Sequence, residues 1–441
     1  MDTDILSFNP GTLSEALSRI ASDIPSLYND NAGKAIKSLS LKEYSLEDDE
    51  QLHSVVLEVG LLDKLLQLAK KEMEKVKINK QDPYYEKFIS FVDRPSIWRF
   101  AFNTPTVYGE YDIRSTMDIT HLKPSVIALH TLKEFKKQGT EFIDLELVQG
   151  HPKNQTYFIA SCPTRSKSVI PDGAFYEKVT DVNGVAMGKM LFTIEYKFNG
   201  LFTHADFWEK INLINDESIS TSENKAPLAI PSNYPTKNDR YKPKKTCTII
   251  VQVYNQMRSE KVDFALLSTY AETHFVYRRT INGLNTLIFS ESITNRNLTV
   301  LHCVGWCLHS LTPNANALYN DPDMSLVKSW FNFKKMNTSK YINKLIKLVD
   351  SGIIGIPEAC FRAQSQEPDW QEFLKSLEKK EKNTKIIKQA KHKKDSGDDS
   401  FRLDDDDDDE ILEGGSTSRP YLPRTAKNDA DGHLKESSGT D

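Results

Sequence analysis

The chain has 441 residues, of which 39% are hydrophobic and 27% charged, and its formal net charge at pH 7 is -5. At roughly 100 to 200 residues per domain, this length leaves room for two or three domains with sizeable cores. No apolar stretch approaches the roughly 20 residues of a membrane helix, and the first residues lack the basic start and apolar core of a secretory signal. We therefore expect no membrane partner and an intracellular location, nuclear or cytoplasmic, which the five scattered cysteines also suit.

The first segment, residues 1–83, is predicted to be a helical N-terminal region. From Asp49 onward its apolar residues recur at helical spacing and are followed by a charged stretch. Such helices favour a small helical domain or a surface that binds a protein partner. The apolar residues are Leu52, Val55, Val56, Val59, Leu62, Leu65, Leu66 and Leu68.

Residues 84–311 read as an α/β core. An amphipathic helix is predicted over 124–138, with Pro124 at its start, and strands over 142–150 and 155–162. Two further strands, 167–179 and 189–198, flank the turn sequence DVNG and predict a hairpin. A polar insertion near 199–245 follows, then a helix over 246–258 and strands over 262–271 and 272–281. This order predicts a mixed β-sheet core flanked by helices.

The C-terminal part divides in two by composition. Residues 312–394 contain helical patterns at 325–333 and 340–356 and end in a lysine-rich segment, which favours either a nuclear import signal, contact with nucleic acid or a solvated helix end. Residues 395–441 contain an acidic run and no periodic apolar residues, so they are predicted to be a disordered acidic tail.

The predicted hairpin places an acidic and a basic side chain on one face. Successive side chains of a strand alternate between its two faces, so Glu195 and Lys197 are neighbours. If the strand that carries Asp172 pairs beside them, two carboxylates and an ammonium group converge. Carboxylate oxygens suit Mg²⁺, or Mn²⁺ in its place, and a lysine stabilises negative charge during hydrolysis of a phosphodiester. The alternative is a surface hairpin in which Glu195 and Lys197 form only a solvated ion pair.

The sequence Pro171-Asp172, followed by Glu195-Tyr196-Lys197, resembles the signature of the PD-(D/E)XK nuclease superfamily. A second match, Pro368-Asp369 followed by Glu378-Lys379-Lys380, falls in a lysine-rich helical segment where no strand pairing would complete a site. The resemblance implies a restriction-endonuclease-like fold and metal-dependent hydrolysis of DNA or RNA.

The resemblance also implies a role for each matched residue. Asp172 and Glu195 would hold Mg²⁺ or Mn²⁺ and Lys197 would stabilise the transition state. A glutamine on the helix after the hairpin matches Gln252 best, with Gln256 as the alternative. An acidic residue on an early helix, a further metal ligand, matches Glu110 best, with Asp112 and Glu134 as alternatives.

Over about Pro95 to Leu311 the pattern is most similar to the nuclease-like modules of fungal Crinkler-type effectors and of fungal-type protein kinases. A kinase domain is not expected, because the segment after Leu311 has no glycine-rich phosphate loop, no His-Arg-Asp catalytic loop and no Asp-Phe-Gly motif. Many relatives of these modules are scaffolds without activity. A catalytically inactive module that binds nucleic acid or a protein is therefore the alternative function.

Basic residues near the motif are candidates for contacts with phosphates. They precede Asp172, precede the helix over 246–258, or end a strand: Arg165, Lys167, Lys242, Lys244, Lys245, Arg278 and Arg279. A separate zinc site is an alternative at Cys303 and Cys307 with His302 and His309, but the segment is apolar and buried thiols on a helix are the commoner case.

Overall fold

The computed structural model describes residues 8–20, 26–27, 46–47, 49–93, 106–107, 110–149, 156–161, 170–180, 186–197, 226–232, 245–269, 272–294, 296–312, 318–335, 345 and 348–349. The chain divides into two compact units, Met1–Gln366 and Glu367–Asp441, and all of the described residues belong to the first. The predicted acidic tail and the lysine-rich segment before it lie outside the described residues.

Nine of the strands within these residues form one mixed sheet, in the order β6-β7-β8-β10-β11-β12-β2-β9 with β13 paired to β11. Two short parallel pairs lie apart from it, β1 (Ser26–Leu27) with β4 (Thr106–Val107) and β3 (Lys77–Ile78) with β5 (Phe142–Ile143). The strands of the large sheet are β2 (Ser54–Glu58), β6 (Tyr157–Ala160), β7 (Gly173–Thr180), β8 (Ala186–Tyr196), β9 (Ala229–Pro231), β10 (Phe264–Ser268), β11 (Glu272–Ile281), β12 (Leu284–Ser290) and β13 (Ile293–Thr294).

The strand directions follow from the connections. β6, β7 and β8 are consecutive in the chain and pair antiparallel, whereas β10 pairs parallel to β8 after a crossover that contains a helix. β11 and β12 form a second antiparallel hairpin, and β12 pairs parallel to β2 from the N-terminal part of the chain. Residues 199–245, predicted as an insertion, supply the short strand β9, which pairs with β2.

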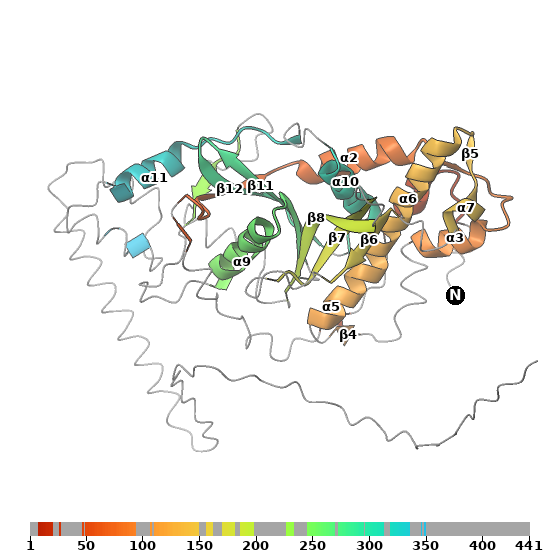
Figure 1. Ribbon diagram of the computed structural model, residues 1–441, viewed down its shortest axis with the longest axis horizontal. Helices are drawn as coiled ribbons and strands as arrows, with labels where there is room; N and C mark the ends of the chain where they lie inside the picture. Colours follow the sequence, from red (N-terminus) through yellow and green to blue (C-terminus); the bar gives the residue numbers. More distant parts are fainter. Residues whose placement is uncertain are drawn as a thin grey trace, which may run out of the picture. The chain divides into compact units, whose positions relative to one another are not determined.

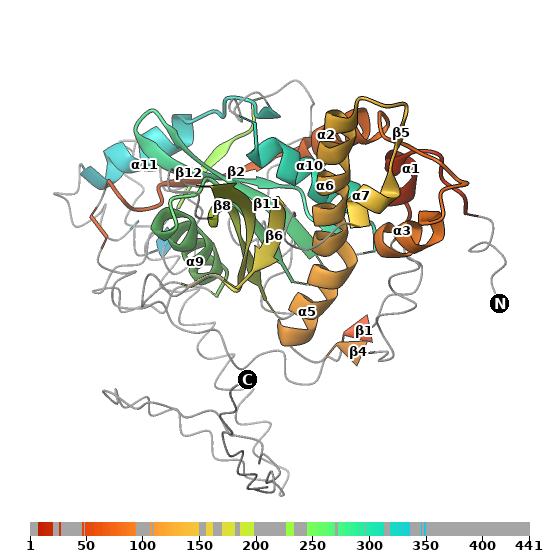
Figure 2. The same cartoon turned by 45° about the vertical axis from the view of Figure 1, so that its right-hand side comes forward.

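Helices cover both faces of the sheet. Figures 1 and 2 show α9 on one face and α2, α6 and α10 on the other. The helices are α1 (Leu13–Leu17), α2 (Leu61–Met73), α3 (Tyr85–Val92), α5 (Glu110–Met117), the π-helical turn η2 (Asp118–Leu122), α6 (Lys123–Gln138), α7 (Leu145–Gln149), α9 (Lys245–Ser259), α10 (Val300–Ser310) and α11 (Ser325–Lys335). α5, η2 and α6 follow one another without a break, and α6 is capped at its C-terminus by Gly139, whose φ of 62° is left-handed.

Two apolar clusters, one on each face, hold these layers together. The α9 side chains Ile249, Val253 and Met257 pack with residues of β2, β10 and β12. α2 and α10 belong to the larger cluster on the other face. These two helices approach so closely that a Cβ atom on Gly305 would lie 2.2 Å from the backbone oxygen of Leu65, so this position requires glycine.

The structure confirms the mixed α/β architecture, the helices at α6, α9, α10 and α11, and the strands β6, β7, β8, β10 and β11. Two predictions are wrong. The helix expected from Asp49 begins only at Leu61, because residues 54–58 form a strand that is buried in the sheet. The strand expected over 142–150 is only two residues long, and Leu145–Gln149 is helical. In both places the apolar spacing is compatible with either structure.

The N-terminal segment therefore belongs to the same compact unit as the sheet. Its strand β2 is part of the sheet, and its helix α2 packs against α10. The predicted turn DVNG of the hairpin and most of the predicted helix over 340–356 lie outside the described residues. Among the helices that the structure describes, none is long and apolar enough to cross a membrane.

Candidate active site

Asp172 and Glu195 lie at the same end of the β7–β8 hairpin. Asp172 directly precedes β7, and the first residue of that strand, Gly173, pairs with Ile194. Asp172 thus stands across from Glu195 on the neighbouring strand. The backbone N–H of Tyr196 donates a hydrogen bond of 2.8 Å to Oδ2 of Asp172 and fixes this carboxylate at the end of β8.

Glu195 is almost fully buried, with a relative exposure of 5%. Oε1 accepts a hydrogen bond from Nζ of Lys197, and Oε2 accepts one of 2.6 Å from Nε2 of Gln256 on α9. Burial raises the pKa of Glu195 to about 7, and the negative charge of Asp172 adds to the effect, although the contacts with Lys197 and Gln256 oppose it. At neutral pH this carboxyl group is thus poised between its two protonation states.

Lys197 follows β8 directly and turns its side chain back to the site. Its backbone N–H donates to the carbonyl of Ser268 at the end of β10, at 2.9 Å, and its side chain is only 13% exposed. Burial disfavours the charged form, but the carboxylates of Glu195, Asp172 and Glu110 outweigh it, so the pKa of Lys197 is raised. The side chain therefore stays an ammonium ion at neutral pH.

The glutamine that contacts Glu195 is Gln256, the alternative of the two predicted. Gln252 lies one turn earlier on α9, on the same side of the helix, and is half-buried. Helical periodicity places both residues on one face but does not say which turn of the helix stands over Glu195.

The early acidic residue Glu110 is exposed and begins α5. Its charge reaches Lys197, where it helps to raise the pKa. Asp112 lies on the same helix, two residues later. Glu134 lies on α6, 24 residues after Glu110, which corresponds to roughly 36 Å along a continuous helix. α5 thus brings Glu110 toward the site, whereas Glu134 lies far along the helix.

A part-buried hydrogen bond ties this helix to β8. The hydroxyl of Tyr196 donates to Oδ1 of Asp118 at 2.8 Å, and Nε of Arg114 lies 3.7 Å from Oδ2 of the same carboxylate. Asp118 is the first residue of the π-helical turn, a type of turn that often occurs at functional sites. Burial raises the pKa of Asp118. Burial also raises the pKa of Tyr196, and the charge of Asp118 adds to this effect. The Asp118–Tyr196 pair was not predicted, since the two residues are 78 positions apart.

The oxygen atoms at this site suit a hard divalent cation. Asp172 and Glu195 offer carboxylates, the ligands that Mg²⁺ and Mn²⁺ prefer. Thr193 lies two residues before Glu195 on the same face of β8, and its Oγ1 and Oε1 of Gln256 are buried without a hydrogen-bond partner among the described residues. In the described part of the chain no three His, Cys, Asp or Glu side chains already form a metal site. The residues fit such a cation once Glu195 releases Lys197.

Arg278 and Arg279 lie away from this site. They are near the far end of β11, beside the beginning of β10, whereas Glu195 is level with the end of β10. Each is ion-paired, Arg278 with Asp263 at 2.9 Å and Arg279 with Asp321 at 3.1 Å. The other predicted phosphate contacts fall on parts that are not described: Arg165, Lys167, Lys242, Lys244 and the side chain of Lys245, which begins α9.

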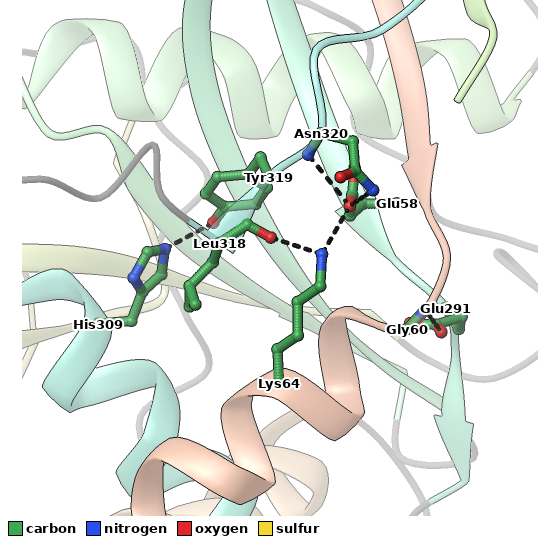
Figure 3. Close-up of polar contacts among 8 residues, drawn as sticks. All are labelled: Glu58, Gly60, Lys64, Glu291, His309, Leu318, Tyr319 and Asn320. Atoms are coloured by element: carbon green, nitrogen blue, oxygen red, sulfur yellow. Dashed lines mark hydrogen bonds and ion pairs between the residues drawn. The ribbon is translucent and has the colours of Figure 1, made fainter. Parts of the chain in front are cut away.

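A second polar cluster surrounds Glu58, at the end of β2 (Figure 3). Oε1 of this buried carboxylate accepts from Nζ of Lys64 at 3.1 Å and from Nδ2 of Asn320 at 2.9 Å. Burial is the main reason that the pKa of Glu58 is raised. Lys64 also donates to the carbonyl of Leu318, so the cluster joins β2, α2 and the segment before α11. Its contacts are structural, and the prediction of a helix over this stretch gave no reason to single out Glu58.

The cysteines of α10 are part of the core. Cys303 and Cys307 are buried in the cluster that contains α2. His302 bonds to Thr299 at the start of the helix, and Nε2 of His309 lies 3.0 Å from the hydroxyl of Tyr319. Both histidines thus take part in contacts other than with the thiols.

Comparison of the chain with family models, with curated proteins and with solved structures finds no match.

Proposed function

We propose that the protein is a metal-dependent nuclease that hydrolyses phosphodiester bonds of DNA or RNA. The observation that carries the proposal is the convergence of Asp172, Glu195 and Lys197 at the adjoining ends of two paired strands, with Glu195 held by Gln256. The order of a helix, three antiparallel strands, a second helix and a strand parallel to the third agrees with the restriction-endonuclease-like core that the resemblance implies. Membership in the PD-(D/E)XK superfamily is part of the proposal.

Asp172 and Glu195 would hold Mg²⁺ or Mn²⁺, with Glu110 as a further ligand. When bound, the cation supplies positive charge at the scissile phosphate and lowers the pKa of water. Lys197, freed from Glu195, remains protonated and stabilises the negative charge that develops on the phosphoryl oxygens. Gln256 keeps Glu195 oriented through Oε2.

Hydrolysis forms a bond between a water oxygen and phosphorus and breaks one phosphorus–oxygen ester bond. The water gives up a proton, and the departing ester oxygen takes one, so protons balance. The raised pKa of Lys197 makes its ammonium a stabilising cation rather than the group that accepts the proton of the water. In this scheme the nucleophile is water and no covalent intermediate with the protein forms.

The proposal is tested by incubating plasmid, linear duplex and single-stranded nucleic acids with Mg²⁺ or Mn²⁺. We expect cleavage by the wild type and a loss of at least about 100-fold in the Lys197→Ala variant, since removal of one stabilising group from an active site has effects of this order. Lys189→Ala is the matched control, because Lys189 lies on the same strand but is exposed. Equal cleavage by all three proteins would assign any activity to a contaminant and reject the site.

A catalytically inactive module that binds nucleic acid or a protein partner is the second candidate. It is favoured by the full engagement of Glu195, whose two oxygens are bonded to Lys197 and Gln256 as in a structural network. The helices of the N-terminal region would be the surface for a protein partner. Under this proposal the wild type binds nucleic acid or protein but cuts nothing with either cation. A nuclear or a cytoplasmic location suits both proposals.

A further inference from the structure

Helix α5 passes beside the end of the hairpin that carries the candidate site. Nη2 of Arg114 donates a 2.9 Å hydrogen bond to Oγ of Ser161, the residue after β6. Because Ala160 pairs with Ala174, Ser161 lies next to the start of β7 and hence beside Asp172. α5 also packs against β8. The guanidinium group of Arg114 therefore stands at the rim of the site.

The same rim carries exposed apolar groups. Tyr111 is 80% exposed, the highest value among the exposed large hydrophobic side chains that the structure describes. Ile170, two residues before Asp172, is 42% exposed. With 3.6 residues per helical turn, Arg114 lies on the helix surface between Glu110 and Tyr111. An isolated exposed ring is ordinary on a protein surface, but this one adjoins a guanidinium group and a candidate metal ligand.

These groups match the two parts of a nucleotide. A tyrosine ring stacks on the face of a base, and a guanidinium group pairs with phosphate oxygens. Arg114 is 32% exposed, and a guanidinium group has five donors, so its contacts with Ser161 and Asp118 leave others for a phosphate. The bases inside a duplex already stack on one another, so only an unpaired base offers its face to Tyr111.

We propose that Tyr111 and Arg114 form a nucleotide-binding subsite that selects single-stranded nucleic acid, with Tyr111 stacked on an unpaired base and Arg114 on the adjoining phosphate. This inference rests on the proposed nuclease function and names its substrate class. The acids Glu110, Asp172 and Glu195 repel phosphates, so binding requires a divalent cation at the site.

The test measures binding separately from cleavage. Fluorescence anisotropy follows the binding of a labelled 20-nucleotide DNA strand, of its RNA counterpart and of the DNA duplex of the same sequence, in Ca²⁺, with the intact length of each verified on a gel. The full-length wild type is compared with Tyr111→Ala and Tyr111→Phe. Phe91→Ala is the matched control, because Phe91 is an exposed aromatic residue, 51% exposed, on α3.

We expect Tyr111→Ala to weaken single-strand binding roughly 5- to 150-fold, the range measured for loss of one stacked base, and to change duplex binding less than twofold. Tyr111→Phe keeps an aromatic ring and should bind the single strand as the wild type does. Phe91→Ala should leave single-strand binding unchanged. Unaltered single-strand binding by Tyr111→Ala, or tighter binding of duplex by the wild type, overturns the inference. If the wild type still cleaves and Lys197→Ala does not, the proposed nuclease function holds without this subsite. No binding of any strand by the wild type overturns both.

Discussion

The pKa of Glu195 makes the stability of the metal-free protein depend on pH at this one site. Its folded-state value is raised from 4.5 to about 7. Between these two values the folded protein binds the proton more tightly than the unfolded chain does, so the free energy of unfolding falls as pH rises. The stabilisation that comes from the proton on Glu195 is fully present below pH 4.5 and is lost as pH rises through 7.

Each unit of pKa shift corresponds to 1.36 kcal/mol, so this site weakens the fold by about 3 kcal/mol between pH 4.5 and pH 8. The Glu195→Gln variant lacks the titrating group and keeps a similar shape. We therefore expect its free energy of unfolding, relative to that of the wild type, to rise by about 3 kcal/mol over this interval.

Urea denaturation at half-unit steps of pH, in a chelator, measures this difference. Glu141→Gln, which removes an exposed carboxylate before β5, is the matched control. Parallel curves for the wild type and Glu195→Gln would refute the reasoning, because they would mean that the carboxyl group ionises alike in the folded and unfolded chains.

Three further substitutions test other parts of the fold. Tyr196→Phe removes the hydrogen bond to the buried carboxylate of Asp118 and should cost about 1–3 kcal/mol in urea denaturation. Lys64→Met leaves Glu58 without its cation, and because Lys64 is 35% exposed we expect about 2 kcal/mol rather than the full cost of a broken buried pair. Gly305→Ala forces α10 away from the backbone of α2 and should cost about 3 kcal/mol, measured as a lower midpoint of thermal unfolding.

Each of these results has a control. Tyr196→Phe keeps the backbone N–H that holds Asp172, so Mn²⁺ binding should persist; loss of Mn²⁺ binding by the variant would mean that the Tyr196–Asp118 hydrogen bond also positions the site. Combining Lys64→Met with Glu58→Gln should recover part of the loss, and no recovery would mean that the two side chains are not coupled. A Gly305→Ala protein as stable as the wild type would show that the two helices separate without cost.

The sequence predicts the hairpin and its chemistry because both depend on short-range rules. A period of two residues places Glu195 and Lys197 on one face, and a short loop makes the strand of Asp172 its neighbour. The remaining contacts of the site depend on tertiary packing. Gln252 and Gln256 share a face of α9, and only the position of that helix along β8 selects Gln256.

Long-range pairing also explains the errors in the fold. Val55 and Val56 fit the spacing of a helix, but they lie in a strand that is buried on both faces between β12 and β9. Strands of this kind read as continuous apolar runs without alternation. Likewise, no local pattern in the polar insertion predicts that Ala229–Pro231 forms the strand β9 at the edge of the sheet.

The central claim is that Asp172 and Glu195 share one cation. Calorimetric titration of the wild type and of Asp172→Asn with Mn²⁺ at pH 7 tests it most directly. We expect one site per chain in the wild type, with uptake of Mn²⁺ accompanied by proton release because Glu195 must ionise, and binding weakened at least tenfold in the variant. Equal binding by the two proteins, or no binding by the wild type, would contradict the account.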